Sequence, residues 1–282
     1  MKILDKEFLK NIFSLKDKVV VVTGASGLLG RMHVEAIASQ GGIPVIIDID
    51  EKGLNELYDF IVAEYSIEPH IELIDITNEL QIAECAERVA NKYGKIDGLV
   101  NNAARNPSVS KNKKLNFSRL ENFDLDVWNK DLSVGITGSF LCIKYFGYKI
   151  SLNDNGGSIV NISSDLGVIA PDQRIYRQEN TDMDMQPVKP VSYSVVKSAL
   201  LGLSRYTSTY WAERNVRSNC LLPGGVKTDQ DDIFMSKLEN LIPLKRMAIQ
   251  NEYQGALIFL LSDASSYMTG SNLIMDGGRS AW

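Results

Sequence analysis

The sequence is poor in the residues that mark several common protein classes. Its 282 residues include only three cysteines, Cys85, Cys142 and Cys220, which lie in apolar stretches without CxxC spacing, and two histidines, His33 and His70. Disulfide scaffolds and structural zinc sites need more of these residues at closer spacing. We therefore expect reduced core thiols and no metal.

Long apolar runs and blocks of like charge are also missing. The apolar run at 255–262 is too short to cross a bilayer, and a net charge of −5 without basic clusters disfavours nucleic acid as a partner. In segment 1–14, Ile3, Leu4 and Phe8 recur at roughly helical spacing between charged residues, which predicts an amphipathic lead-in helix rather than a signal peptide. We expect a soluble, cytoplasmic protein that does not bind membranes.

What the sequence does contain is an alternation of short β-branched runs with longer helical patterns. Between the runs, 54–66 and 79–94 each place apolar residues on one helical face. Strands that are apolar throughout and separated by helices predict an α/β fold: one doubly wound parallel sheet of about seven strands, covered by helices on both faces. We expect a single domain over 15–282. The strand candidates are KVVVVTG, IPVIIDI, HIELIDI, IDGLVNNA, GSIVNISS, VRSNCLLPG and SNLIMDGG.

A glycine-rich turn, TGASGLLG at 23–30, follows the first predicted strand and opens a helix. Gly24 permits the tight turn, Gly27 lets backbone approach a pyrophosphate, and Gly30 lets the helix pack closely on the strand. Asp48 ends the second strand, about 20 residues further on, where a carboxylate can accept hydrogen bonds from the adenosine ribose. A carboxylate there repels a 2′-phosphate, so the pattern favours NAD over NADP. Asp50 is the alternative strand-end carboxylate.

From about Leu15 to Gly278 the chain resembles the short-chain dehydrogenase/reductase family. The resemblance rests on motifs that occur in order at the ends of successive strands: TGASGLLG, DI (75–76), NNAA (101–104), NISS (161–164), YSVVK (193–197), PGGVKT (223–228) and MTGSNLIMDGG (268–278). Each motif alone is weak, but the ordered set is specific.

The resemblance implies a catalytic group of three residues. Tyr193 and Lys197 are at i and i+4 and so project from one helix face. A tyrosine with a reference pKa of about 10 needs a nearby cation to act as a base at neutral pH. Tyr193 is thus the expected general acid/base. Lys197 is expected to lower the pKa of Tyr193 and to bind the nicotinamide ribose. Ser164 orients the substrate oxygen, with Ser163 as its nearest competitor.

The resemblance also assigns residues along the cofactor. Asp75 and Ile76 are expected along the adenine, and Val226 and Thr228 at the nicotinamide carboxamide. For Asn101 two roles are open: a contact with the cofactor, or a structural role that braces neighbouring strands. The expected cofactor-binding residues are Gly24, Ser26, Gly27, Leu28, Leu29, Gly30, Asp48, Ile49, Asp75, Ile76, Asn102, Ala103, Ala104, Ile162, Tyr193, Lys197, Pro223, Gly224, Val226 and Thr228.

Two departures from the family pattern concern single positions. Short members usually read TGxxxGxG, whereas this turn reads TGxxGxxG, typical of extended members that act on nucleotide sugars; yet the short C-terminal part belongs to the short form. Gly135 stands where members commonly have an asparagine that helps hold a water in the proton relay. The proton relay of this protein then either lacks the asparagine side chain or uses another side chain in its place, for example that of Ser133.

A third departure is an insert at about 171–190, which lengthens the interval between Ser164 and Tyr193. It mixes basic residues with Asp172, Glu179, Asp182 and Asp184. A long loop beside an active site is often functional. We hypothesise that Arg174 or Arg177 contacts an anionic part of the substrate; a solvated loop whose charges pair locally is the alternative. The basic and aromatic residues of the insert are Arg174, Tyr176, Arg177 and Lys189.

Together these features predict an NAD-dependent oxidoreductase that interconverts an alcohol and a carbonyl. Segment 210–226 also resembles short-chain enzymes of bacterial surface-glycan and flagellin-sugar pathways, which favours a sugar or sugar-phosphate substrate. Two alternatives stay open: a nucleotide-sugar dehydratase or epimerase that uses NAD within one turnover, and a non-catalytic NAD-binding regulator. The family's last helix and strand commonly pack on a partner chain, so we expect a homodimer or homotetramer.

Overall fold

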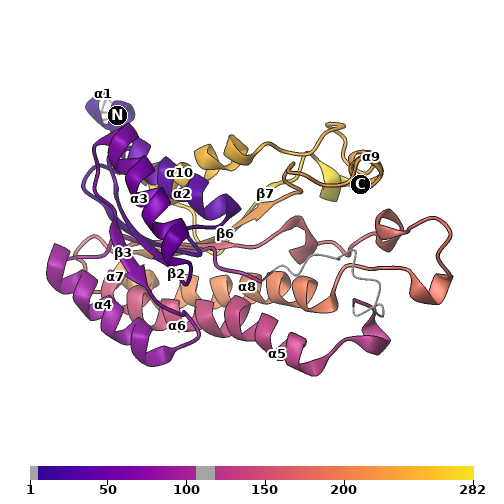
Figure 1. The fold of residues 1–282 in the computed structure, drawn as a ribbon. Coiled ribbons are helices and arrows are strands. Elements are labelled where there is room, and N and C mark those ends of the chain that lie inside the picture. The colour runs from indigo at the N-terminus through magenta and orange to yellow at the C-terminus, as the bar shows by residue number, and fades with distance from the viewer. Residues whose placement is uncertain (1–5, 106–117) are drawn as a thin grey trace.

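The computed structural model describes residues 6–105 and 118–282, and its centre is one seven-stranded sheet (Figure 1). Every neighbouring pair of strands is parallel, and the strand order is β3-β2-β1-β4-β5-β6-β7. The order reverses between β1 and β4, which makes the sheet doubly wound and confirms the predicted fold class. The strands are β1 (Val19–Thr23), β2 (Ile43–Asp48), β3 (His70–Leu73), β4 (Gly98–Asn101), β5 (Gly157–Ile162), β6 (Val216–Pro223) and β7 (Asn272–Met275).

Helices cover both faces of the sheet, α2, α3 and α10 on one and α4 to α8 on the other (Figure 1). Their bounds are α1 (Lys6–Asn11), α2 (Leu28–Ser39), α3 (Glu51–Tyr65), α4 (Glu79–Tyr93), α5 (Leu125–Leu132), α6 (Ser139–Cys142), α7 (Tyr148–Ile150), α8 (Val191–Tyr210), α9 (Asp232–Glu239) and α10 (Gln254–Leu261). Helices α5 to α7 are joined by π-helical turns at 133–138 and 143–147, and they form one continuous rod.

The alternation of side chains along β1 divides the core into two layers. Val20 and Val22 pack with α2, α3 and α10, whereas Val19 and Val21 face the cluster that includes α4 and the rod of α5 to α7. Because both faces are buried, the strand has valine at each position from Val19 to Val22, and only its last residue, Thr23, is polar. The apolar faces predicted for 54–66 and 79–94 are buried, with Leu54, Leu57 and Ile61 in α3 and Ile82, Cys85 and Val89 in α4.

The segment between β5 and α8 carries the insert and contains short 3₁₀ turns at 173–176 and 183–185. Ile175 belongs to a small apolar cluster with Leu238, and the Tyr176 ring lies 5.4 Å from the Phe234 ring of α9. The Lys237 ammonium donates to the Arg177 carbonyl at 2.7 Å. The insert is therefore held against α9 at the carboxyl edge of the sheet. Within the described residues, each helix is too short or too polar to span a bilayer.

Candidate active site

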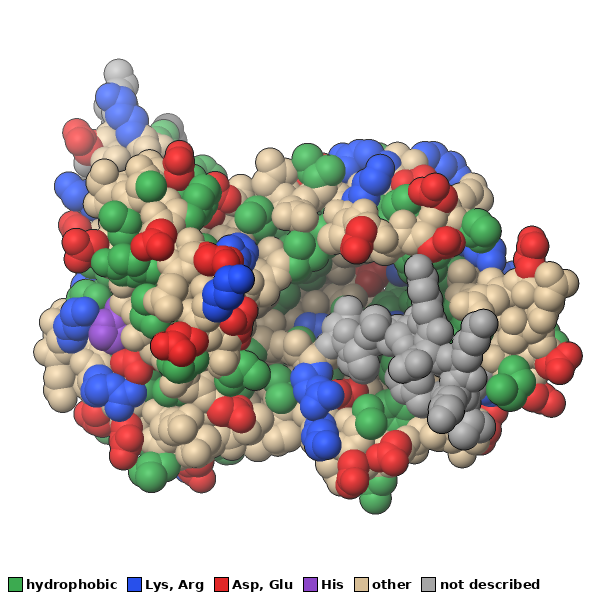
Figure 2. Space-filling model, viewed as in Figure 1, with side chains coloured by type: hydrophobic (Ala, Val, Ile, Leu, Met, Phe, Trp, Pro, Cys, Tyr) green, Lys and Arg blue, Asp and Glu red, His purple; other side chains and the backbone are tan. Residues whose placement is uncertain are grey.

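A cavity of about 910 Å³ opens along the carboxyl edge of the sheet, where the strand order reverses. Figure 2 shows the molecule hollowed on this face, between its upper and lower parts. The expected catalytic and cofactor-binding residues line this cavity, with the exception of Gly30. Parallel strands bring them together because all their carboxyl ends meet at one edge.

The glycine turn between β1 and α2 lines one end of the cavity. Gly24 has φ +63°, and a Cβ on it would lie 2.7 Å from the Cα of Ala103. A Cβ on Gly30 would lie 2.1 Å from the Gly24 carbonyl oxygen, so Gly30 packs the helix on the turn rather than facing the cavity. Gly27 is the residue before α2, whose first backbone N–H groups have no helical partner. The turn thus offers an anion cradle at a helix N-terminus.

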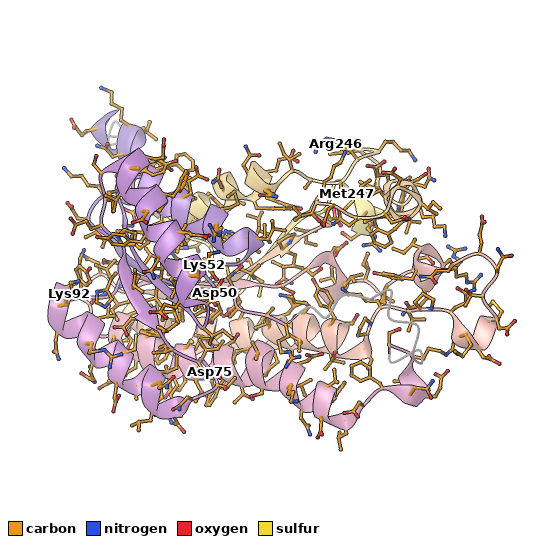
Figure 3. All side chains as sticks on the ribbon, in the orientation of Figure 1. Asp50, Lys52, Asp75, Lys92, Arg246 and Met247 are labelled. Atoms are coloured by element: carbon orange, nitrogen blue, oxygen red, sulfur yellow. The ribbon has the colours of Figure 1, made fainter. Side chains whose placement is uncertain are left out.

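Asp48, at the end of β2, is held in place by the turn and by its own neighbours. One carboxylate oxygen accepts from the Ser26 amide at 3.0 Å and from the Ser26 hydroxyl at 2.6 Å; the other accepts from the amides of Ile49 and Asp50. Asp50 instead caps α3, accepting from the Gly53 amide at 3.1 Å (Figure 3). Asp48 is therefore the carboxylate that lines the cavity, and Asp50 is a helix cap.

Two neighbouring asparagines at the carboxyl end of β4 have different roles. The Asn101 side chain is buried and donates to the Asn161 side chain at 2.9 Å, which braces β4 against β5. The Asn102 side chain donates to the carbonyls of Thr23 and Gly24, so it ties the β4 end to the glycine turn. Asn101 thus has the bracing role, and Asn102 shapes the cavity.

Tyr193, Lys197 and Ser164 converge at the other end of the cavity. Tyr193 and Lys197 lie on consecutive turns of α8, with the Lys197 ammonium 5.8 Å from the Tyr193 ring centroid and donating to the Ile162 carbonyl at 2.8 Å. Ser164 hydrogen-bonds to Tyr193 and donates to the Asp165 carboxylate at 2.7 Å. The Ser163 hydroxyl instead donates to the Lys197 carbonyl at 2.7 Å. Ser164 is therefore the serine that meets the phenol.

Burial sets the protonation of this group. It raises the pKa of Tyr193, which the hydrogen bond with Ser164 partly offsets. Burial also lowers the pKa of Lys197 to about 8, with the nearby Lys189 acting in the same direction. A low-dielectric site disfavours the phenolate of Tyr193 and the ammonium of Lys197, so each charged form would be stabilised by the opposite charge of the other.

Gly135 sits in the first π-helical turn, where the rod passes α8. A Cβ on it would lie 2.4 Å from Cγ1 of Val196. An asparagine would therefore clash with α8 unless Val196 moved. Ser133, the residue suggested as a substitute in the relay, is not among those lining the cavity.

Three charged residues at the Tyr193 end of the cavity, Lys189, Asp165 and Arg279, were not assigned a role from the sequence. The Lys189 ammonium lies 3.8 Å from the Tyr193 ring centroid, and the Arg279 guanidinium pairs with Asp165 at 2.7 Å, with both side chains buried. Asp165 directly follows Ser164, which was a signal available in the sequence. Nothing local marks Arg279, because 114 positions separate it from Asp165.

The two insert arginines lie elsewhere. Arg174 is 74% exposed in its side chain and pairs with Asp172 at 2.7 Å. Neither Arg174 nor Arg177 is among the residues that line the cavity, so a contact with substrate would need the insert to rearrange. The insert contributes Ile175, Tyr176 and Lys189 to the lining instead.

Comparisons with known proteins agree with this geometry. The family model described as short chain dehydrogenase matches residues 18–176, and the model described as Enoyl-(Acyl carrier protein) reductase matches residues 182–280. Post-translational flagellin modification protein A of Campylobacter coli is 30% identical, over 94% of this chain and 98% of that protein. An NAD-dependent glycerol dehydrogenase of Listeria innocua is 29% identical, over 94% and 95%.

A solved structure shows the same architecture. The short chain dehydrogenase from Leptospira borgpetersenii with bound NAD⁺ superimposes with a TM-score of 0.81 at 27% identity, covering 99% of this chain and 98% of that one. The chain thus matches these relatives along nearly its whole length and has the same fold. The chain belongs to the short-chain dehydrogenase/reductase family and is an NAD(P)-dependent oxidoreductase.

Proposed function

We propose that this protein interconverts an alcohol and a carbonyl on a sugar or polyol with NAD as the hydride carrier. One observation carries the proposal: a single cavity has the Asp48 carboxylate and the glycine turn at one end and Tyr193 with Lys197 at the other. This arrangement matches a dinucleotide laid along the strand ends with its reactive ring at Tyr193.

The chain's own residues provide the proton chemistry. Tyr193 as phenolate accepts the hydroxyl proton of an alcohol, and as phenol it returns that proton to a carbonyl oxygen in the reverse direction. Lys197 and Lys189 both place an ammonium near the Tyr193 ring and so favour the phenolate. Ser164 hydrogen-bonds the same substrate oxygen and holds it beside the phenol. NAD⁺ bound here would supply the hydride acceptor for the alcohol carbon, and its oxidised nicotinamide ring would add a positive charge at this end before hydride transfer.

The cavity's other end fits the adenosine half of the cofactor. Gly24 and the start of α2 form a phosphate cradle, and Asp48 offers carboxylate oxygens to two ribose hydroxyls. The same carboxylate would repel a 2′-phosphate, which supports NAD over NADP. Ile49, next to it, is apolar and offers no charge to a phosphate.

The relatives support a small polyhydroxylated substrate. The flagellin-modification relative and the glycerol dehydrogenase are each similar along nearly the whole chain, and the TGxxGxxG turn and segment 210–226 favour a sugar from surface-glycan synthesis. We place the reaction in the cytoplasm.

The direct test is incubation of the purified enzyme with NAD or NADP and a panel of polyols, sugars and sugar acids. We expect net formation of reduced nicotinamide with NAD, seen by its near-ultraviolet absorbance. Product formation without net reduced nicotinamide would instead support the dehydratase or epimerase alternative. NAD binding without turnover of any panel member would favour the regulator.

We also propose that the protein is a homodimer or homotetramer. Large apolar side chains are exposed on the outer face of the rod and α8, among them Phe140, Tyr148, Tyr206 and Tyr210. The Tyr206 and Tyr210 rings stack at 5.7 Å and form a flat aromatic surface. Light scattering coupled to gel filtration gives the mass directly; a monomer at micromolar concentration would contradict this.

A further inference from the structure

The substrate end of the cavity has more positive than negative side chains. Four cationic residues line the described cavity: Arg105, Lys189, Lys197 and Arg279. The other described carboxylates of the lining are at the adenosine end, where Asp48 ends β2 and Asp75 follows β3, which leaves Asp165 as the lining carboxylate near Tyr193. Arg105 is in addition paired with the buried Asp131 at 3.3 Å.

Among the described residues that line this end of the cavity, Asp165 is the one carboxylate beside Lys189, Lys197 and Arg279. It pairs with Arg279 at 2.7 Å, where the two side chains are only 3% and 8% exposed. The same carboxylate is the charge that acts on Lys189, whose pKa it raises. One negative charge therefore acts on both Arg279 and Lys189, with Lys197 close by, and these four described side chains together have a net positive charge. A buried cationic cluster of this kind is stabilised by an anion brought by a ligand.

Lys189 is held at a fixed place beside the reacting group. Its amide donates to the Gln173 side chain at 2.8 Å, and the Val188 amide donates to the Ser118 hydroxyl at 3.1 Å. Pro190 then precedes the first residue of α8. This anchoring sets the ammonium 3.8 Å from the centroid of the Tyr193 ring. Burial lowers the pKa of Lys189 to about 8, so its charge is less stable there than in water.

We infer that the substrate carries an anionic group, a carboxylate or a phosphate, close to the carbon that is oxidised, and that Lys189 binds this group with Arg279 behind it. The inference rests on the proposed function and narrows its substrate class from polyols to sugar acids or sugar phosphates. It also gives the insert a function: its last residues bring a cation to the reacting end, while Arg174 stays paired at the surface.

The test compares ligands that differ only in charge. Ribitol, ribonate and ribitol 5-phosphate, and the six-carbon set of mannitol, mannonate and mannitol 1-phosphate, are titrated calorimetrically into the full-length enzyme saturated with NADH. The proteins are the wild type, Lys189→Met, Lys189→Arg and Lys130→Met. Lys130 is an exposed lysine of α5 that does not line the cavity, so it controls for the change in net charge.

We expect at least one anion to bind the wild type about 10- to 100-fold more tightly than its neutral partner, the effect of one charge-assisted hydrogen bond. Lys189→Met should abolish this preference, whereas Lys189→Arg and Lys130→Met should keep it. A larger preference for the acid identifies a carboxylate, and a larger preference for the ester identifies a phosphate.

Equal affinity of the wild type for neutral and anionic ligands, or no binding of any anion, would overturn the inference. A Lys189→Met enzyme that loses neutral and anionic ligands equally would also overturn it, because the lysine would then only shape the site or position Tyr193. Oxidation with NAD is assayed in parallel. A charge preference without oxidation contradicts the proposed reaction alone, and oxidation without a charge preference contradicts this inference alone.

Discussion

The two ends of the cavity are built in different ways. At the adenosine end, Asp48 bonds to Ser26 and to the two residues that follow it, and Asp50 caps the helix that begins one residue later. At the substrate end, Asp165 pairs with Arg279 across 114 positions, and Lys189 reaches Tyr193 from the insert. The contacts of Asp48 and Asp50 thus reach at most 22 positions along the chain, whereas the pair of Asp165 with Arg279 joins far more distant segments.

The largest expected effect concerns the substrate end. Tyr193→Phe removes the phenolic proton but keeps the ring beside Lys189 and Lys197. Loss of a general acid/base costs roughly 10²- to 10⁴-fold in rate, so kcat should fall by that factor. NAD affinity, measured by calorimetry, should stay within about threefold because the adenosine end is untouched. An active Tyr193→Phe enzyme would contradict the proton role of Tyr193.

This difference between the two ends also explains what the sequence could predict. The sheet, the glycine turn and Asp48 follow from short-range patterns, because apolar strands, a glycine at φ +63° and a strand-end carboxylate each leave a local signal. The sequence left Ser163 and Ser164 as candidates for the catalytic serine, and the hydrogen-bond acceptor of each hydroxyl in the structure decides between them.

The substrate end gave less local signal. A charged residue in a loop has many possible partners, and only the folded chain shows that Arg279 meets Asp165 or that Lys189, rather than Arg174, enters the cavity. The same holds for Gly135, whose meaning depends on its contact with Val196 of α8. Sequence spacing indicated that the insert matters and could not indicate which of its cations faces inward.

The buried ion pair gives the second-largest effect. Asp165→Ala leaves the Arg279 guanidinium buried without its partner and should lower the free energy of unfolding by about 3–5 kcal/mol. Asp172→Ala breaks the exposed pair with Arg174 in the same region and should cost no more than about 1 kcal/mol. Urea denaturation followed by circular dichroism measures both. Equal losses in the two variants would show that burial of the Asp165 pair is not what matters.

Asp48 tests the adenosine end. Asp48→Ala removes the carboxylate expected to bind the ribose, and one charge-assisted interaction corresponds to about a 10- to 100-fold rise in KM for NAD. The preference for NAD over NADP, taken as the ratio of kcat/KM values, should fall as well. Asp50→Ser is the matched control: it removes a neighbouring carboxylate but keeps a capping side chain for α3, so both values should stay near the wild type.

The smallest expected effect concerns His33, a fully buried residue of α2 behind the glycine turn. Neither ring nitrogen has a hydrogen-bond partner among the described residues, and burial lowers the pKa of His33 to about 3. Between pH 6.5 and pH 3 the unfolded chain therefore binds a proton at this position that the folded chain does not. The contribution of neutral His33 to the free energy of unfolding is therefore fully present above pH 6.5 and is lost as the pH falls, by about 2 kcal/mol at pH 5.

In His33→Phe, the fall in unfolding free energy between pH 7 and pH 5 should shrink by that amount, whatever the variant's absolute stability. His70→Phe is not a matched control, because His70 bonds to Glu72, whose pKa it helps to lower to about 2. The stability that depends on the Glu72 carboxylate is lost mainly as the pH falls below its ordinary pKa of 4.5, outside the window from pH 7 to pH 5. An unchanged slope in His33→Phe would mean that the imidazole finds a partner in solution, and that the helix behind the turn is less tightly packed than the substrate end.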